Sequence, residues 1–299
     1  MNSDVWSGVY PALTTKFKAD FSLDYDAMAE HLEFQLNAGV HGVIILGSLG
    51  ENSSLTAEEK LELTAFFHKQ VAGRVPLLAC IAESETRQAC NLAAKSQEIG
   101  VDGFMLLPPM RYPSDRRETL TYLEDVAAAS ELPVMLYNNP VAYGTDLTPG
   151  DFEQLAANPK FIAIKESSTD TRRIADIRRL VGERYSIFCG VDDLAFECFS
   201  MGAVGWVAGL VVAFPRATVR LYDLMSAGRW AEARTLYEWF LPLLHLDIGP
   251  KFVQQIKLVE EIVGVGTACV RPPRLSLADE DENRVRKIVA QALADQPDI

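Results

Sequence analysis

One lysine stands at the end of a short apolar run, where its amine could act as a nucleophile. Lys165 follows Phe161–Ile164, four apolar residues typical of a buried strand. Apolar surroundings disfavour the ammonium form, lower the pKa and leave an amine that attacks a carbonyl or imine carbon. An isolated lysine at a strand end more often extends its charge to water. Because two other predicted strand ends carry compatible polar groups, we favour Schiff-base chemistry at Lys165.

A tyrosine and a glycine-flanked serine follow two other apolar runs. Tyr137 ends the run Pro133–Tyr137. Its phenol could carry protons to and from a Schiff base, although a structural tyrosine bonded to a backbone carbonyl is an equally good interpretation. The sequence GSLGE at 47–51 predicts a tight turn with exposed amides. Such amides and the Ser48 hydroxyl could hold a carboxylate, but the motif alone also fits an ordinary turn.

A glycine and two aspartates follow a fourth run. Gly190 could let a ligand approach the backbone, and we interpret Asp192 and Asp193 as charges at a helix N-terminus. The histidines fall in helices or loop starts and not at strand ends: His31, His41, His68 and His245. A metal site or a Ser–His hydrolase needs histidine at the site, and no phosphate-binding or dinucleotide-binding fingerprint occurs. We therefore expect no metal and no other cofactor.

Eight apolar runs alternate with amphipathic segments of helix length. The runs are Gly8–Thr14, Gly42–Gly47, Val75–Ile81, Gly103–Leu107, Pro133–Tyr137, Phe161–Lys165, Ser186–Gly190 and Ala203–Ala208. Eight such units predict an α/β fold, a (β/α)₈ TIM barrel, whose active site lies at the C-terminal ends of the strands. An open doubly wound sheet is the alternative. It usually needs a Gly-rich turn after the first strand, which the sequence at 14–16 does not provide.

Helix signals agree with this division of the chain. Thr56 with Glu59 predicts a capping box, and Pro149 stands at a first helical position. Beyond Pro215 the pattern is helical, in the segments Ala217–Ala227, Trp230–Leu244, Lys251–Val263 and Glu280–Leu293. The first of these would close the barrel. We therefore predict a barrel carrying the active site at 1–228 and a C-terminal helical appendage at 229–299.

The charge of the 299-residue chain argues against several classes of partner. A net charge of -13 disfavours nucleic acid and anionic membrane, which both need a basic surface. The longest apolar stretch, Ala203–Phe214, is too short to span a bilayer. The N-terminus lacks signal-peptide features, and the five cysteines include no C-x-x-C pair. We expect a cytoplasmic protein without disulfides, in which local donors hold any anionic substrate.

Three motifs together resemble the dihydrodipicolinate synthase / N-acetylneuraminate lyase family. They are GSLGE at 47–51, YNNP at 137–140 and IKES at 164–167, in the order of the family. The likeness runs through nearly the whole chain and includes Gly190 and RPPRL at 271–275. The resemblance implies that Lys165 forms the Schiff base, that Tyr137 shuttles protons, and that Ser48 with the Leu49 amide binds the substrate carboxylate.

The same resemblance guides our expectations for the rest of the site. We expect the substrate to contact further residues beside Leu49, namely Gly47, Asn139, Ser167, Gly190 and Val207. Members of the family need no cofactor and are commonly tetramers, so we expect a homotetramer. The expected partner is a small 2-oxo acid or a cyclic imine.

Three departures from the synthase pattern concern the substrate. Leu49 stands where the synthase loop usually has its second threonine. The segment 107–113 reads LPPMRYP instead of the synthase TPYYN, which displaces Tyr112 by one residue. Ala142 replaces the arginine that grips the second carboxylate in the synthase. Because a bidentate clamp is lost, condensation of pyruvate with aspartate semialdehyde is not expected to be the main activity.

The segments WSGVYPALTT, YNNPVAYG and CGVDD resemble a catabolic branch of the family. That branch deaminates Δ1-pyrroline-4-hydroxy-2-carboxylate in hydroxyproline breakdown. Lys165 would attack the ring C=N carbon, and Tyr137 and Ser48 would move protons while the 4-hydroxyl leaves as water. Hydrolysis would then release ammonia and 2-oxoglutarate semialdehyde. Our sequence-based hypothesis is a Schiff-base-forming lyase with this deaminase activity.

Three alternatives stay open. One is 4-hydroxy-tetrahydrodipicolinate synthase, which condenses pyruvate with aspartate semialdehyde. Another is an aldolase or dehydratase of a 2-keto-3-deoxy sugar acid, whose hydroxyls Asn139, Ser167 and Ser168 could bind. The last is a ligand-binding barrel without catalysis, which the joint presence of Lys165, Tyr137 and Ser48 disfavours.

Overall fold

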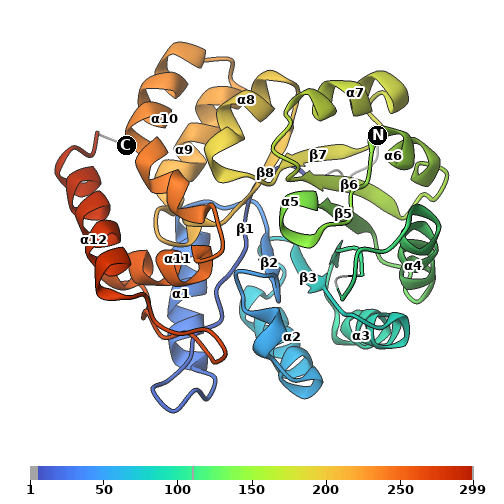
Figure 1. Cartoon of the computed structure of the whole chain (residues 1–299), viewed down its shortest axis with the longest axis horizontal. Helices are drawn as coiled ribbons and strands as arrows, with labels where there is room; N and C mark the ends of the chain where they lie inside the picture. Colours follow the sequence, from blue (N-terminus) through green and yellow to red (C-terminus); the bar gives the residue numbers. More distant parts are fainter. Residues whose placement is uncertain (1–5, 110, 298–299) are drawn as a thin grey trace.

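Eight parallel strands form one sheet that curves into a barrel (Figure 1). The computed structural model describes residues 6–109 and 111–297. Residues 1–5 of the predicted barrel, Met110, and residues 298–299 of the predicted appendage lie outside the described residues. The strands are β1 (Gly8–Pro11), β2 (Val43–Ile45), β3 (Leu77–Ile81), β4 (Gly103–Leu106), β5 (Val134–Asn138), β6 (Phe161–Glu166), β7 (Ser186–Cys189) and β8 (Gly205–Ala208). The prediction of a TIM barrel is confirmed.

The strand order runs from β2 through β3 to β8 and then to β1. The ring closes between β1 and β2 through an isolated parallel bridge of Ala12 with Ile44, and the Leu13 amide donates to the Ile44 carbonyl over 2.8 Å. The register pairs Tyr137 of β5 with Lys165 of β6. This pairing places the two side chains next to each other at the same end of the barrel.

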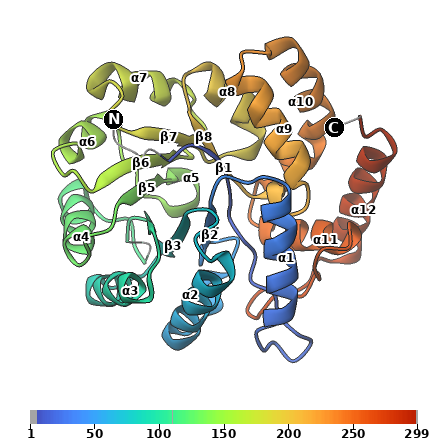
Figure 2. The same cartoon turned by 180° about the vertical axis from the view of Figure 1, so that it is seen from behind.

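Helices cover the outside of the barrel, and along the chain they alternate with the strands (Figures 1 and 2). They are α1 (Tyr25–Asn37), α2 (Ala57–Val71), α3 (Thr86–Ile99), α4 (Arg116–Ala128), α6 (Pro149–Leu155), α7 (Arg172–Val181), α8 (Ala195–Ser200) and α9 (Pro215–Ser226). Both predicted helix starts are confirmed: Thr56 and Thr148 each form a capping box, and Pro149 opens α6.

Short turns of 3-10 helix and a one-turn helix lie where the strands end. They are η1 (Asn52–Ser54), α5 (Pro140–Tyr143), η2 (Asp192–Leu194), η3 (Leu210–Val212) and η4 (His245–Asp247). Four of them follow β2, β5, β7 and β8 directly, whereas η4 comes from the C-terminal helical region. These turns place polar side chains around the mouth of the barrel.

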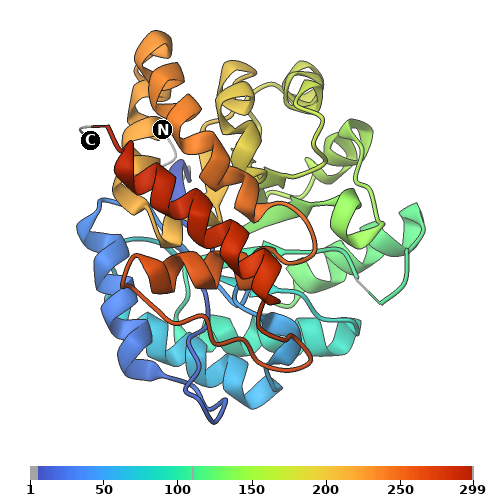
Figure 3. The ribbon, with the colours of Figure 1, turned by 60° about the vertical axis from the view of Figure 1, so that its left-hand side comes forward.

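The C-terminal helices pack against one another and against the barrel (Figure 3). They are α10 (Trp230–Leu244), α11 (Phe252–Ile262) and α12 (Asp279–Ala294). Two buried ion pairs join α11 to the loops after β1 and β2. The Nζ of Lys257 lies 2.6 Å from Oε1 of Glu51, and the Nζ of Lys16 lies 2.6 Å from Oε1 of Glu260. The appendage is therefore anchored at the catalytic end of the barrel.

Candidate active site

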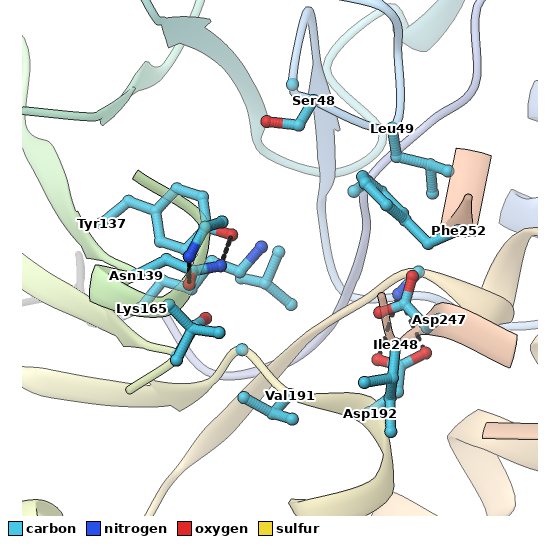
Figure 4. Close-up of a pocket in the computed structure, with 18 of the residues that line it drawn as sticks. Ser48, Leu49, Tyr137, Asn139, Lys165, Val191, Asp192, Asp247, Ile248 and Phe252 are labelled. Carbon is cyan, nitrogen blue, oxygen red and sulfur yellow. Dashed lines mark hydrogen bonds between the residues drawn. The ribbon is translucent and has the colours of Figure 1, made fainter. Parts of the chain in front are cut away.

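A cavity of about 460 Å³ opens at the C-terminal ends of the strands (Figure 4). All nine residues that the sequence analysis assigned to the site line this one cavity. They are Gly47, Ser48, Leu49, Tyr137, Asn139, Lys165, Ser167, Gly190 and Val207. The barrel thus brings together groups that are spread over 161 positions of the chain, from 47 to 207.

Lys165 is buried, with only 7% of its surface exposed, and its amine faces an aromatic ring. The Nζ atom lies 4.1 Å from the centre of the Tyr137 ring. Burial lowers the pKa of Lys165, although the nearby phenol of Tyr143 and the carboxyl of Asp247 oppose this shift. No carboxylate among the described residues lies within ion-pair distance of the amine. A larger share of free amine at neutral pH follows.

Gly190 is required by the lysine itself. A Cβ atom built on Gly190 would stand 2.0 Å from Oγ of Ser167 and 2.7 Å from Cγ of Lys165. The space that the sequence analysis reserved for a ligand is therefore occupied by these two side chains. The Ser167 hydroxyl is buried and has no hydrogen-bond partner among the described residues. It is free to bind a group in the cavity.

The GSLGE loop turns in a way that the glycines did not predict. The left-handed residues are Leu46, directly before the loop, with φ of 62°, and Glu51, with φ of 56°. Gly50 is needed for space instead, because a Cβ there would stand 2.9 Å from the Leu13 carbonyl oxygen. The amides of Ser48 and Leu49 donate to no group within 6–109 or 111–297. Two adjacent free amides at the cavity form a suitable cradle for a carboxylate.

Tyr143 is a site residue that the sequence analysis did not identify. Its hydroxyl lies 2.5 Å from Oγ of Ser48, and its ring meets the Tyr137 ring edge to face with 5.8 Å between centres. Burial raises the pKa of Tyr143, so the phenol stays protonated. Ser48, Tyr143 and Tyr137 thus bring three hydroxyl groups to one wall of the cavity, all from a single chain.

The position of Tyr143 follows from a local motif. Asn139 caps the single turn α5, since its Oδ1 accepts from the Ala142 amide at 3.0 Å and Pro140 takes the first helical position. Gly144 ends the turn in the left-handed region, with φ of 75°. One helical turn returns Tyr143 towards Asn139, whose Nδ2 donates to the Tyr137 hydroxyl at 3.1 Å. The pattern N-P-x-x-x-G at 139–144 was the available sequence signal.

The C-terminal helical region also supplies part of the cavity wall. Asp247, at the end of η4, lines the cavity together with Ile248, Gly249, Pro250 and Phe252. The sequence analysis placed the active site within 1–228 and named none of these residues. No local pattern marks them, because their position depends on how α10 and α11 pack on the barrel.

Asp192 has a role beyond the one that the sequence analysis gave it. It lies in the first turn of η2, as expected of a charge at a helix N-terminus, but its side chain does not cap that turn. Its carboxylate accepts from Trp206 Nε1 at 2.9 Å, from the Gly209 amide at 3.1 Å and from the Leu210 amide at 2.7 Å. Asp192 therefore fixes the loop after β8.

At the positions where this chain departs from the synthase pattern, the described residues add no cationic side chain to the cavity. Ala142 lines the cavity, whereas Tyr112 is 54% exposed and does not. Lys165 is the only lysine or arginine among the lining residues that the structure describes. A second carboxylate would therefore find no charged partner. Within the described ranges, no group of histidine, cysteine and acidic side chains is arranged to hold a metal ion.

Comparison with known proteins identifies the family. Residues 5–292 match the model of the dihydrodipicolinate synthetase family. Two similar relatives are named 4-hydroxy-tetrahydrodipicolinate synthase. The protein of Methanospirillum hungatei is 27% identical over 96% of this chain and 99% of its own, and that of Caldicellulosiruptor bescii is 30% identical over 97% and 96%.

Solved structures agree with this result. Dihydrodipicolinate synthase from Aquifex aeolicus superimposes with a TM-score of 0.92 at 26% identity, over 96% of this chain and 98% of its own. YagE of Escherichia coli K12, solved in complex with pyruvate, gives 0.90 at 28% identity, over 96% and 99%. The chain is therefore a lyase of the dihydrodipicolinate synthetase family.

Proposed function

We propose that Lys165 forms a Schiff base with a 2-oxo acid or a cyclic imine that carries a single carboxylate. The observation that carries this proposal is a buried lysine that has no ion-pair partner in 6–109 or 111–297, beside Tyr137 and in a cavity with two amides that are free within the same ranges. The related protein YagE was solved in complex with pyruvate, which is the simplest compound of this class.

The substrate carboxylate would bind the amides of Ser48 and Leu49. Its binding there would place the neighbouring carbon near the Lys165 amine at the centre of the cavity. The amine adds to this carbon, and a proton must then move from nitrogen to the departing oxygen or nitrogen. Three hydroxyl groups, those of Tyr137, Tyr143 and Ser48, could pass this proton on, so that no hydroxide or alkoxide ion has to be released.

Within this class, we favour deamination of Δ1-pyrroline-4-hydroxy-2-carboxylate. Addition of the Lys165 amine to the C=N carbon breaks the ring C–N bond and leaves an open-chain Schiff base. Loss of the proton at C3 gives an enamine, whose electrons expel the 4-hydroxyl as water. A proton shift then converts the C5 amine into an imine, and hydrolysis of both imines releases ammonia and 2-oxoglutarate semialdehyde. The reaction consumes one water overall. Lys165 is the only cationic side chain in the described lining, so a second carboxylate would have no cation to pair with. This favours a substrate with one carboxylate.

The second candidate is 4-hydroxy-tetrahydrodipicolinate synthase, the activity that the names of the relatives carry. It shares the Schiff base with pyruvate but then needs a site for the carboxylate of aspartate semialdehyde. Ala142 and the apolar side chains of Val141 and Phe252 offer no such site within the described cavity. The homotetramer and the cytoplasmic location stay predictions. No helix in the described parts of the chain is both long and apolar enough to cross a membrane.

Trapping with borohydride tests the proposal. The protein is incubated with Δ1-pyrroline-4-hydroxy-2-carboxylate, with pyruvate or with a 2-keto-3-deoxy sugar acid, reduced, and its intact mass is measured. We expect an adduct in the wild type and none in Lys165→Ala. Release of ammonia identifies the deaminase, and consumption of aspartate semialdehyde with pyruvate identifies the synthase. An adduct that persists in Lys165→Ala contradicts the assignment of the nucleophile.

A further inference from the structure

Asp247 has a position that the family motifs do not explain. It comes from η4 of the C-terminal helical region and lies across the cavity from Tyr137 and Lys165 (Figure 4). Its carboxyl rests directly on the backbone of Gly209, where a Cβ atom would stand 2.3 Å from Oδ1 and 2.9 Å from Oδ2. Any other residue at 209 would displace this carboxyl, so the end of β8 is shaped to admit it.

The two neighbouring aspartates differ in their hydrogen bonds. Asp192 accepts from the indole of Trp206 and from the amides of Gly209 and Leu210. Asp247 accepts no hydrogen bond from any of the described residues, and it lines the cavity. The three donors stabilise a charge on Asp192, and nothing comparable stabilises one on Asp247.

The charge state of Asp247 follows from this difference. Burial raises the pKa of Asp247 well above that of an ordinary carboxyl, and the charge of Asp192 adds to the effect. Lys165 opposes the shift, but its own pKa is lowered. When two close carboxyl groups compete, the one with fewer donors keeps the proton. Of the two aspartates, Asp247 is therefore the better placed to hold a proton and to offer an O–H group to the cavity.

A protonated carboxyl opposite the Schiff base matches one step of the proposed reaction. The carboxylate cradle and the three hydroxyl groups lie on the side of Ser48 and Tyr143, so the far end of a bound substrate points to another wall. Resting on the proposed function, we propose that Asp247 is the catalytic acid that protonates the leaving 4-hydroxyl. The Asp247 proton passes to the hydroxyl oxygen as the C4–O bond breaks, enamine electrons form the new C=C bond, and water departs. Solvent then returns a proton to the carboxylate.

The test separates formation of the Schiff base from loss of water. Wild type and Asp247→Asn are mixed with Δ1-pyrroline-4-hydroxy-2-carboxylate and reduced with borohydride. The intact mass of each protein is then measured, and ammonia release is followed in parallel. We expect Asp247→Asn to form the adduct but to keep both the hydroxyl oxygen and the ring nitrogen, so that its reduced adduct is heavier than the wild-type adduct, which has lost water before reduction. Its ammonia release should fall by roughly 10²- to 10⁴-fold, the usual contribution of a general acid.

A substrate analogue and a second variant exclude a purely structural effect. With Δ1-pyrroline-2-carboxylate, which has no leaving hydroxyl, exchange of the C3 hydrogens with heavy water should be equally fast in wild type and Asp247→Asn. Asp247→Ala should recover part of its ammonia release when formate is added. Asp193→Asn is the matched control, because Asp193 is the neighbouring acid that does not line the cavity; it should keep the wild-type rate.

The outcomes distinguish the two proposals. An Asp247→Asn enzyme that releases ammonia at the wild-type rate, or whose adduct has already lost water, overturns the role of Asp247 and leaves the deaminase intact. A wild-type enzyme that forms an adduct with pyruvate alone overturns the deaminase and the role of Asp247, because no hydroxyl then leaves, and keeps only the Schiff base on Lys165.

Discussion

Two regions of the molecule bury a lysine, and among the described residues only one of the two lysines has an ion-pair partner. In the cavity, the Lys165 amine faces an aromatic ring and has no carboxylate within ion-pair distance among the described residues. At the junction of α11 with the barrel, Lys257 contacts Glu51 and the Cys269 carbonyl oxygen, each at 2.6 Å. Lys257 is fully buried, and Lys165 almost so. Burial alone therefore does not identify a nucleophile; the missing partner does.

The junction shows what a buried charge needs when it serves structure. Glu260 receives the Lys16 ammonium at 2.6 Å, the Thr14 hydroxyl at 2.8 Å and the ring of His31 at 3.1 Å. Such a network restores the interactions that were lost with water. Lys165 has no such network among the residues that the structure describes, and burial lowers its pKa. The cavity removes its reactive groups from water without replacing all of the lost interactions. The junction holds the helices that form one wall of that cavity.

Replacing the unpaired lysine should separate activity from stability most clearly. Lys165→Met removes the nucleophile but keeps a side chain of similar length, so activity should fall by roughly 10⁴- to 10⁶-fold. Unfolding in urea should show unchanged or higher stability, because no partner carboxylate is left behind. Steady-state rates and denaturation midpoints measure both effects. A large loss of stability would mean that Lys165 also has a structural role.

The same change at the junction should do the reverse. Lys257→Met removes the nearest cation from buried Glu51, which keeps only Arg274 at 3.7 Å, and should lower the free energy of unfolding by about 3–5 kcal/mol. The double variant Lys257→Met with Glu51→Leu should regain a substantial part of this loss. Arg74→Met, in an exposed pair with Glu33, is the control and should cost less than about 1 kcal/mol. Equal midpoints for Lys257→Met and wild type would contradict the contrast between the two lysines.

Acid should weaken the junction before it affects the rest of the barrel. Burial lowers the pKa of His31 to about 4, and the charge of Lys16 contributes to this shift, so the unfolded chain binds the extra proton first. Stability present above pH 6.5 should therefore decrease as the pH falls from 6.5 to 4, by on the order of 3 kcal/mol. Denaturation midpoints across this range, with His31→Gln as reference, measure the effect. A wild-type slope identical to that of His31→Gln would exclude it.

The hydroxyl groups of the cavity should give the smallest change. Tyr143→Phe removes the 2.5 Å contact with Ser48 and should lower kcat by roughly 10²-fold, with little change in KM. Ser48→Ala should have a similar effect. If the two hydroxyls act in one relay, the double variant is little worse than either single variant. Fully additive losses would show that they act separately.

Most of the barrel could be predicted because its signals are local. Apolar runs, the capping box of Thr56 with Glu59, and Pro149 mark strands and helices by chemistry that acts over a few residues. The barrel rule then placed Lys165 and Tyr137 at one end, and their register confirms that they are neighbours. The resemblance to the family supplied the rest of the nine assigned residues, and all nine line one cavity.

The rest of the site depends on contacts between distant segments. The turn of the GSLGE loop relies on left-handed Leu46 and Glu51, residue types that rarely adopt this conformation. Glu51 tolerates it within a buried ion pair with Lys257, a residue 206 positions later. Asp247 reaches the cavity only through the packing of the C-terminal helices. Neither relationship has a signal within a short window of sequence.

The separation of Glu51 from Lys257 also sets an order of events during synthesis. A ribosome that adds about 5–20 residues per second needs roughly 10–40 s to make the intervening 206 residues. Throughout that time the carboxylate lacks its cation, and the wall that contains Asp247 has not emerged. A nascent barrel can therefore assemble its strands but keeps a hydrated, open mouth. Catalytic competence would appear late, when the last quarter of the polypeptide docks on the first.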